Sequence, residues 1–204
     1  SVTEVYMSTP NLPLRLELIN SGAAAETTLD HICSSIMSEG GIEKNGKLLY
    51  LTTGGTPLVA ATAGVIYAVI GIKLKAAALG AVIDIVQIAI QIQTASESGE
   101  WTLRLNPTVA STFTYSDVTN YAVQRAVGTV SNTVTGGTVL QGGFSNSDSA
   151  SAGGNGGIAD HIENAIRLGS NIAGTPDTMV LCWMPNAATA AHNIEGSITV
   201  RELS

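Results

Sequence analysis

The stretch VQIAIQIQT, residues 86–94, constrains the fold more than any other segment, because its apolar and polar residues alternate without interruption. Successive side chains of a β-strand point to opposite faces of a sheet. The stretch therefore predicts a strand with β-branched residues on one, buried face and the glutamines Gln87, Gln91 and Gln93 on the other. The glutamine face suits water or another subunit, since it is uncharged and a solvated strand usually carries more Lys and Glu.

Half-buried alternation of the same kind recurs along the chain, for example at residues 13–20, 100–107 and 196–203. Gly and Pro separate roughly eight or nine such runs. Residues 27–41 predict one short amphipathic helix that ends at a Gly-Gly pair, and residues 158–169 predict either a second short helix or a strand pair. Half-buried strands with few helices predict a mainly β fold, an antiparallel β-sandwich or barrel with one or two short helices. We expect a single domain over residues 1–204.

Asp84 interrupts the pattern, because it shares its parity with Val86 and Ile88. A regular strand would bury its carboxylate in the core, which is costly for a charge without a partner. Either a β-bulge near residue 85 reverses the register, or the strand protrudes there and Asp84 is solvated. We favour the bulge.

Three segments read as connections rather than strands. The two TGGT copies, at residues 53–56 and 135–138, predict hairpin turns. The low-complexity stretch at residues 144–157 predicts a loop of Ser, Gly and Asn. Such a loop is either a solvated connection or an arm that orders against a neighbouring subunit.

Composition restricts the partners. Charged residues make up only 12% of the chain, against about 25% in ordinary soluble domains, so the surface is mostly neutral. A neutral surface favours a protein packed against its neighbours. The net charge of −7 comes without a basic run, and the apolar run at residues 58–72 is shorter than the roughly 20 residues of a membrane span. We therefore expect neither nucleic acid nor a membrane as partner, and we expect Cys33 and Cys182 to be core residues without a bridge.

The sequence carries no recognisable catalytic constellation. Its three histidines are far apart and lack metal-ligand spacing, and the TGGT copies lack the further residues of a phosphate or dinucleotide loop. A nucleophile elbow is also missing. We therefore predict no catalytic residue, no cofactor and no metal site, and a protein that is not an enzyme.

One succession of motifs runs along most of the chain: TPNLPLRLELINSGA, LDHICSSIMSEGG, LNPT and VTGGTVLQGGF. This succession resembles a group of tailed-bacteriophage virion proteins, in which an extended Pro-Leu-rich strand, here residues 13–20, leads to a short helix ending in Ser-Glu-Gly-Gly, here residues 29–41. The resemblance implies a non-enzymatic particle component with a jelly-roll-like sandwich, similar to capsid decoration proteins or to the body of fibre and knob proteins. Relatives usually carry further strands upstream, so an N-terminal anchoring segment before Ser1 stays an open question.

Two functions follow as expectations. The first is a capsid decoration or cement protein of the virion, a homotrimer bound to the major capsid protein or other virion proteins, with Gln87, Gln91 and Gln93 as a candidate subunit interface. A merely solvated polar face is the alternative for those glutamines. The second function is a fibre, knob or spike module that binds a host surface glycan. Exposed aromatic residues would favour the second, because sugars stack on Trp and Tyr, but Trp101 and Trp183 are expected in the core.

Overall fold

The computed structural model describes residues 46–147, 167–171, 174–186 and 192–203. The chain divides into two units, Ser1–Glu43 and Lys44–Ser204, and every described residue belongs to the second. The strand predicted at residues 13–20 and the helix predicted at residues 27–41 lie outside the described residues, as does Cys33. The prediction of one domain over the whole chain therefore stays a prediction.

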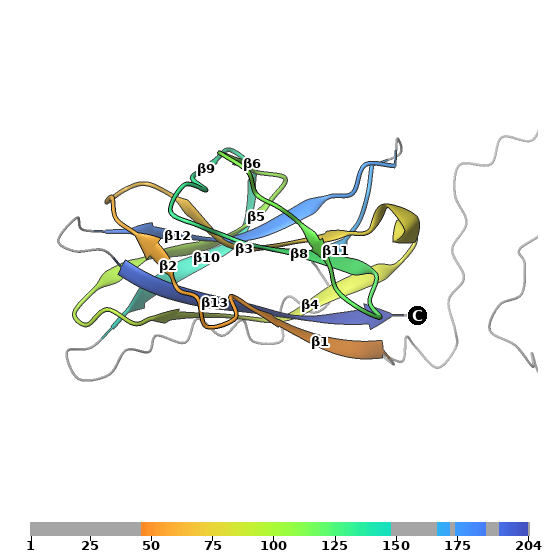
Figure 1. Ribbon diagram of the computed structural model, residues 1–204, viewed down its shortest axis with the longest axis horizontal. Coiled ribbons are helices and arrows are strands. Elements are labelled where there is room, and N and C mark those ends of the chain that lie inside the picture. The colour runs from red at the N-terminus through yellow and green to blue at the C-terminus, as the bar shows by residue number, and fades with distance from the viewer. Residues whose placement is uncertain (1–45, 148–166, 172–173, 187–191, 204) are drawn as a thin grey trace, which may run out of the picture. The chain divides into compact units, whose positions relative to one another are not determined.

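The described chain is almost entirely β-strand, as predicted, and forms two main antiparallel sheets (Figure 1). We call one of them the front sheet. It has the order β1-β13-β4-β11, with β2 also pairing with β13, and its labels β1, β13 and β4 lie along the lower side of Figure 1. The other, which we call the back sheet, has the order β10-β5-β12-β3-β8-β7. Strands β6 and β9 form a separate pair, and the described helical structure is one 3₁₀ turn, η1 (Ala76–Ala78). The strands are β1 (Gly46–Thr52), β2 (Leu58–Ala60), β3 (Tyr67–Leu74), β4 (Val82–Ile92), β5 (Ser98–Leu105), β6 (Thr108–Val109), β7 (Ser116–Asp117), β8 (Val123–Val127), β9 (Val134–Thr135), β10 (Thr138–Asn146), β11 (Arg167–Leu168), β12 (Thr178–Pro185) and β13 (His192–Leu203).

Eight of these strands pair in a nested order. Strand β1 pairs with β13, β3 with β12, β4 with β11, and β5 with β10, all antiparallel. The chain thus resembles one long hairpin whose successive pairs fall alternately in the front and the back sheet. This is the strand arrangement of a jelly roll, a double sheet with Greek-key connections. The predicted antiparallel sandwich is therefore confirmed.

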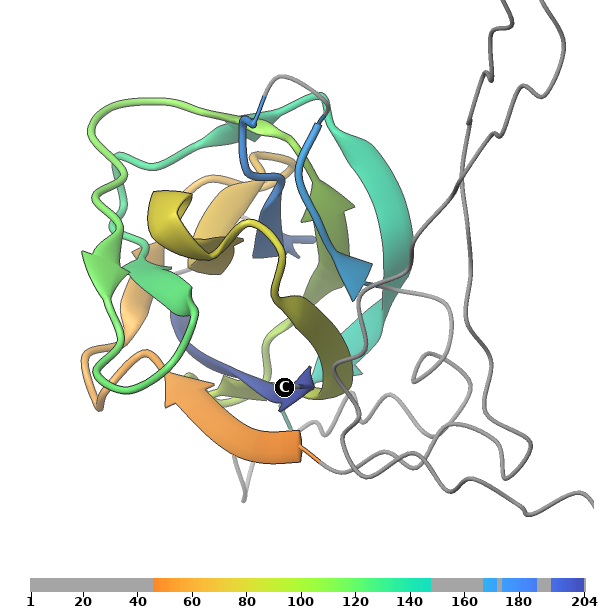
Figure 2. The ribbon, with the colours of Figure 1, turned by 90° about the vertical axis from the view of Figure 1, so that its right-hand side faces the viewer.

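The core lies between the two sheets (Figure 2). The front sheet contributes the isoleucines of β4, which are at most 2% exposed, and the back sheet contributes both tryptophans, Trp101 and Trp183. Both tryptophans are buried, as the sequence predicted. The two sheets approach closely at Gly196, where an added Cβ would lie 2.6 Å from the side chain of Val69. A larger residue at this position would push the sheets apart.

The bulge predicted near residue 85 is present in β4. Ile85 and Gln87 pair with consecutive residues of β13, which leaves Val86 as the extra residue of the bulge. The reversed register turns Asp84 away from the core, into a row with Arg167 of β11. Asp84 is nevertheless only 1% exposed, and its Oδ1 accepts a hydrogen bond of 3.1 Å from the Nε of Arg167. A buried carboxylate is thus matched by a cation, which offsets its desolvation.

Neither TGGT copy forms a hairpin, so that prediction was wrong. The glycines of both copies take positive φ, as a sharp turn requires. The first copy, at residues 53–56, joins β1 to β2, but both strands pair with β13 and lie one after the other along its edge. The second, at residues 135–138, joins β9 to β10, which belong to different sheets. The glycines turn the chain as expected, but cross-strand pairing over long sequence distances decides what the turn connects.

Two further predicted segments are described by the structure only at one end. Residues 144–146, predicted to begin a loop, continue β10 and pair with residues 98–100 of β5. The rest of that stretch, from residue 148, lies outside the described part of the chain. Residues 167–168, at the end of the segment predicted as either a second short helix or a strand pair, form the strand β11, as in the second alternative. Pairing with β4 outweighs the helical spacing there, and residues 158–166 are not described.

The back sheet is covered on its outer side by the chain itself. We call residues 108–115 and 133–135, which include β6 and β9, the cover. Phe113 and Val134 of the cover pack with Val180 and Cys182 of β12 in a second, smaller apolar cluster. The fit is close at Gly71, where an added Cβ would lie 2.6 Å from the Phe113 ring. The cover therefore buries the outer side of β12 and β3, whereas Phe144 on the edge strand β10 of the same sheet is exposed.

Candidate functional site

The outer face of the front sheet is the most unusual surface of the described chain. Gln87, Gln91 and Gln93 are all exposed on it, while the isoleucines between them point to the core, so the predicted orientation of β4 is confirmed. Beside them on β1, Tyr50 is 67% exposed and Leu48 is 57% exposed. The glutamines thus share a face with large apolar side chains. That they contact another subunit stays a prediction.

Strand register arranges this face in rows that run across β1, β13 and β4. Within each row the side chains are direct neighbours, and successive rows are about 7 Å apart, two residues along a strand. Side chains in the middle row are small, whereas the rows on either side carry longer ones. The upper row is Tyr50–Thr199–Gln87, the middle row is Thr52–Ser197–Ala89, and the lower row is Glu195–Gln91. The difference in side-chain length leaves a hollow over the middle row.

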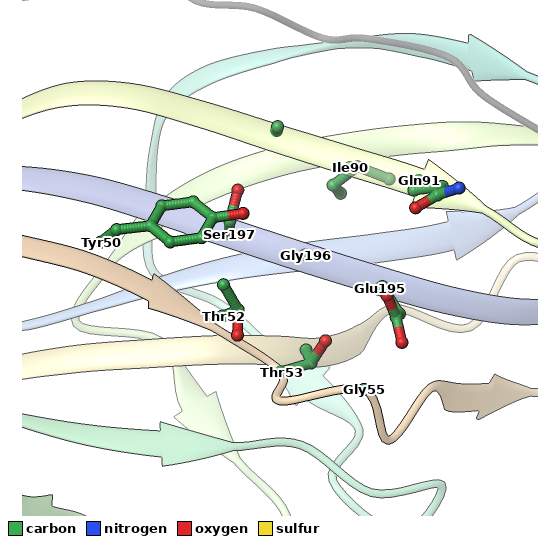
Figure 3. Close-up of a pocket in the computed structure, with 10 residues that line it drawn as sticks. Tyr50, Thr52, Thr53, Gly55, Ile90, Gln91, Glu195, Gly196 and Ser197 are labelled. Carbon is green, nitrogen blue, oxygen red and sulfur yellow. The ribbon is translucent and has the colours of Figure 1, made fainter.

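This hollow is a groove of about 440 Å³. Figure 3 shows the ring of Tyr50 at one end and the side chains of Gln91 and Glu195 at the other, with Ser197 between them. The first TGGT turn borders the groove through Thr53 and Gly55. The Thr53 amide donates to the backbone carbonyl of Gly196, which keeps the end of β1 attached to β13 as the chain turns.

Charges on this outer face are few and balanced. The described strands place Arg167 and Arg201 on it, against Asp84 and Glu195. Glu195 is the one charged residue among those that line the groove. The face is therefore neutral as a whole, although the chain carries a net charge of −7.

Neither this face nor the rest of the described chain assembles a metal centre. No group of three or more His, Cys, Asp or Glu side chains lies close enough to hold an ion within the described ranges. His192, which the sequence left isolated, is fully buried, and its Nε2 lies 3.1 Å from Oε2 of Glu97. This pair joins the start of β13 to the β4–β5 connection, where Ser147 also bonds the backbone of Glu97. Its geometry fits a structural role.

The back sheet offers little chemistry. A cavity of about 60 Å³ beside Glu100, Thr102 and Arg104 has room for one or two water molecules. Burial raises the pKa of Cys182 to about 12, although Arg104 and Thr102 act in the opposite direction. Burial also raises the pKa of Tyr115, in the cover. Cys182 is a free, buried cysteine, and a thiol that stays protonated is a poor nucleophile.

The sequence prediction missed Tyr50 and Glu195. A signal for Tyr50 was present, because Leu49 and Leu51 alternate with it in GKLLYLTT and so point it away from the core. No signal existed for the groove, since its floor combines three strands that are distant in sequence.

The described residues contain no helix with the length and apolar character needed to cross a membrane. Comparison with models of protein families, with curated proteins and with solved structures finds no match.

Proposed function

We propose that this chain is a non-enzymatic structural protein of a tailed-bacteriophage virion, a decoration or cement protein. It assembles symmetrically with copies of itself, binds the major capsid protein and stabilises the particle. The resemblance of its motifs to virion proteins supports this proposal. The jelly-roll strand order supports it further, because this scaffold is frequent among viral capsid proteins, although a fold alone does not fix a function.

One observation carries the proposal: an outer sheet face that is neutral and partly apolar. Tyr50 and Leu48 stand exposed there, beside the uncharged glutamines of β4. Interface cores are enriched in Tyr and depleted in Lys and Glu relative to the remaining surface. Solvated strands of a monomer would usually carry more charge at these positions. The face is thus suited to being covered by protein, and Gln87, Gln91 and Gln93 are its proposed contact residues.

Binding to capsids tests this function. The purified chain is mixed with empty phage capsids built from major capsid protein and sedimented through a gradient. We expect it to co-sediment at a fixed ratio and to raise the temperature at which the shells open. Replacing the three glutamines by Lys should reduce both effects, while Asn146→Lys serves as the control, because Asn146 is an exposed uncharged residue on β10 of the other sheet. Failure of the wild-type chain to bind any shell would refute the proposal.

The groove favours a second candidate, a fibre or spike module that binds a host glycan. Tyr50 offers an aromatic face for a sugar ring, and Glu195 and Gln91 offer planar polar groups for its hydroxyls. Lectins also use jelly-roll scaffolds. A glycan array probed with the wild-type chain and with Tyr50→Ser distinguishes the two candidates. Binding of a polysaccharide that requires Tyr50 would favour the fibre module.

A further inference from the structure

We infer that the outer face of the front sheet binds the same face of a second copy of this chain, through a two-fold axis between the upper and middle rows. The axis lies in the plane of the interface and runs across the strands. The inference rests on the proposed function, because it specifies the self-contact of a protein that assembles symmetrically. It gives a two-fold dimer in place of the homotrimer expected from the sequence. In this dimer, Tyr50 of the second copy occupies the groove.

Shape is the first argument. A two-fold axis in this position reverses the order of the rows, so the upper row of one copy lies on the middle row of the other. Tyr50, the largest exposed side chain of the face, then stands over the hollow above Thr52 and Ser197 of the second copy. Gln87 correspondingly stands over Ala89. Long side chains meet short ones in both directions, as the interdigitation of two stacked sheets requires.

Charge is the second argument. The same axis places the row before Tyr50, which contains Arg201, on the row of Glu195 in the second copy. Each interface therefore brings Arg201 and Glu195 together twice. Within one copy these residues are six positions apart on β13, roughly 20 Å, so they cannot form this contact internally. A net charge of −7 makes copies repel one another in general, but on this face the described charges cancel.

The surroundings favour this face over the other one. The cover already occupies the outside of β12 and β3 in the back sheet, and Gly71 leaves no space beneath it. The exposed large apolar side chains of the back sheet, Val139 and Phe144, lie on its edge strand β10. The outside of the front sheet instead presents Tyr50 and Leu48 to solvent. A second copy resting on it would cover these two side chains.

The first test measures self-association of the full chain by sedimentation over a range of concentrations. We expect a dimer in equilibrium with monomer. Tyr50→Ser, which removes the large side chain, and Ala89→Arg, which fills the hollow, should each raise the dissociation constant at least about tenfold. Phe144→Ser is the matched control, because Phe144 is 79% exposed but lies on β10 of the back sheet, and it should leave the constant within about twofold. A monomer at every concentration, a trimer, or a dimer indifferent to Tyr50 would overturn the inference.

The second test concerns charge. Glu195→Arg places two cations opposite each other across the axis and should weaken the dimer at least about tenfold. Raising the salt concentration should weaken the wild-type dimer but have a smaller effect on Glu195→Gln, which lacks the charge. A wild-type dimer that salt does not affect, or one that Glu195→Arg does not weaken, would contradict the predicted register.

Both tests are run alongside capsid binding, so that the two proposals can fail separately. Capsid binding by a chain that stays monomeric would overturn the two-fold contact and leave the virion function standing. A dimer that depends on Tyr50 but does not bind capsids would support the two-fold contact and refute the virion function. A chain that stays monomeric and binds a glycan through Tyr50 would overturn the two-fold contact and support the fibre module.

Discussion

The two sheets of this sandwich have similar inner faces and different outer faces. In the back sheet, the outer side of β12 and β3 is buried by Phe113 and Val134 of the cover, a part of the same chain. The front sheet exposes Tyr50 and Leu48 on its outside. Only the back sheet has such a cover within the described chain.

A sheet face can be kept from non-specific association either by its own chain or by a partner. An internal cover satisfies the back face permanently and contributes to the stability of each molecule. An uncovered face contributes nothing to the stability of the isolated molecule and is available to a partner. Residues under the cover should therefore govern folding, whereas residues on the front face should govern association.

The reactivity of thiols should show the largest contrast between the faces. In a Cys33→Ser background, folded Cys182 should react with an alkylating reagent at pH 8 roughly a thousandfold more slowly than an ordinary thiol. Its pKa is raised from 9.0 to about 12 by burial, and only the thiolate reacts. The rate should rise as the pH rises, because more thiolate forms. Mass spectrometry of timed samples measures it.

The control places a thiol on the other face. Tyr50→Cys, in a background that also lacks Cys33 and Cys182, should react at the rate of a free thiol. Equal rates for the covered and the exposed thiol would show that the cover does not close over β12.

Truncating one aromatic residue on each face should separate stability from association. Phe113→Ala should lower the free energy of unfolding by about 2–3 kcal/mol, less than for a fully buried Phe because the ring is partly exposed. Tyr50→Ala should change it by less than about 0.5 kcal/mol in dilute protein. Urea unfolding followed by tryptophan fluorescence measures both. A large loss for Tyr50→Ala under dilute conditions would mean that the front face stabilises the single molecule.

Asp84 is an exception on the front face, because it is buried there. Asp84→Ala should cost about 2 kcal/mol, since it removes the partner of Arg167, whose side chain is 51% exposed and so keeps part of its hydration. Asp117→Ala is the comparison: Asp117 lies 3.7 Å from Lys75 with a side chain that is 64% exposed, and its loss should cost less than about 0.5 kcal/mol. Thermal unfolding ranks the two variants. Equal losses would indicate that Asp84 is hydrated in solution.

The smallest effect on stability is expected at Gln87, in the upper row of the front face. Gln87→Lys should leave the free energy of unfolding within about 0.5 kcal/mol of wild type, because the side chain is exposed. Its effect should appear in light scattering, as a lower mass at high protein concentration. A destabilised monomer would place Gln87 in a contact within the chain.

Local patterns predicted much of the fold, because strand orientation depends on neighbouring residues. The alternation at residues 86–94 predicted which side chains of β4 point inward, and the parity of Asp84 predicted the bulge. The same reasoning, applied to Tyr50, would have placed it outside. Each of these inferences needs only a few adjacent positions.

The remaining features depend on residues that are distant in sequence. Nothing near Asp84 indicates Arg167 as its partner, and nothing near His192 indicates Glu97. The groove arises because small residues of three strands fall in one row, which only the register reveals. The failed hairpin predictions have the same cause: glycines specify a turn, but not which strand the chain meets afterwards.

The pairing of β1 with β13 has a consequence for biosynthesis. Strand β13 lies between β1 and β4 in the front sheet, yet it is the last strand of the described chain to leave the ribosome. Strands β1 and β4 must therefore wait for β13 before they can form a continuous sheet. During translation the hydrophobic isoleucines of β4 lack their neighbour, and the growing chain depends on rapid completion or on chaperones. Loss of even the final strand would leave the front sheet without its centre.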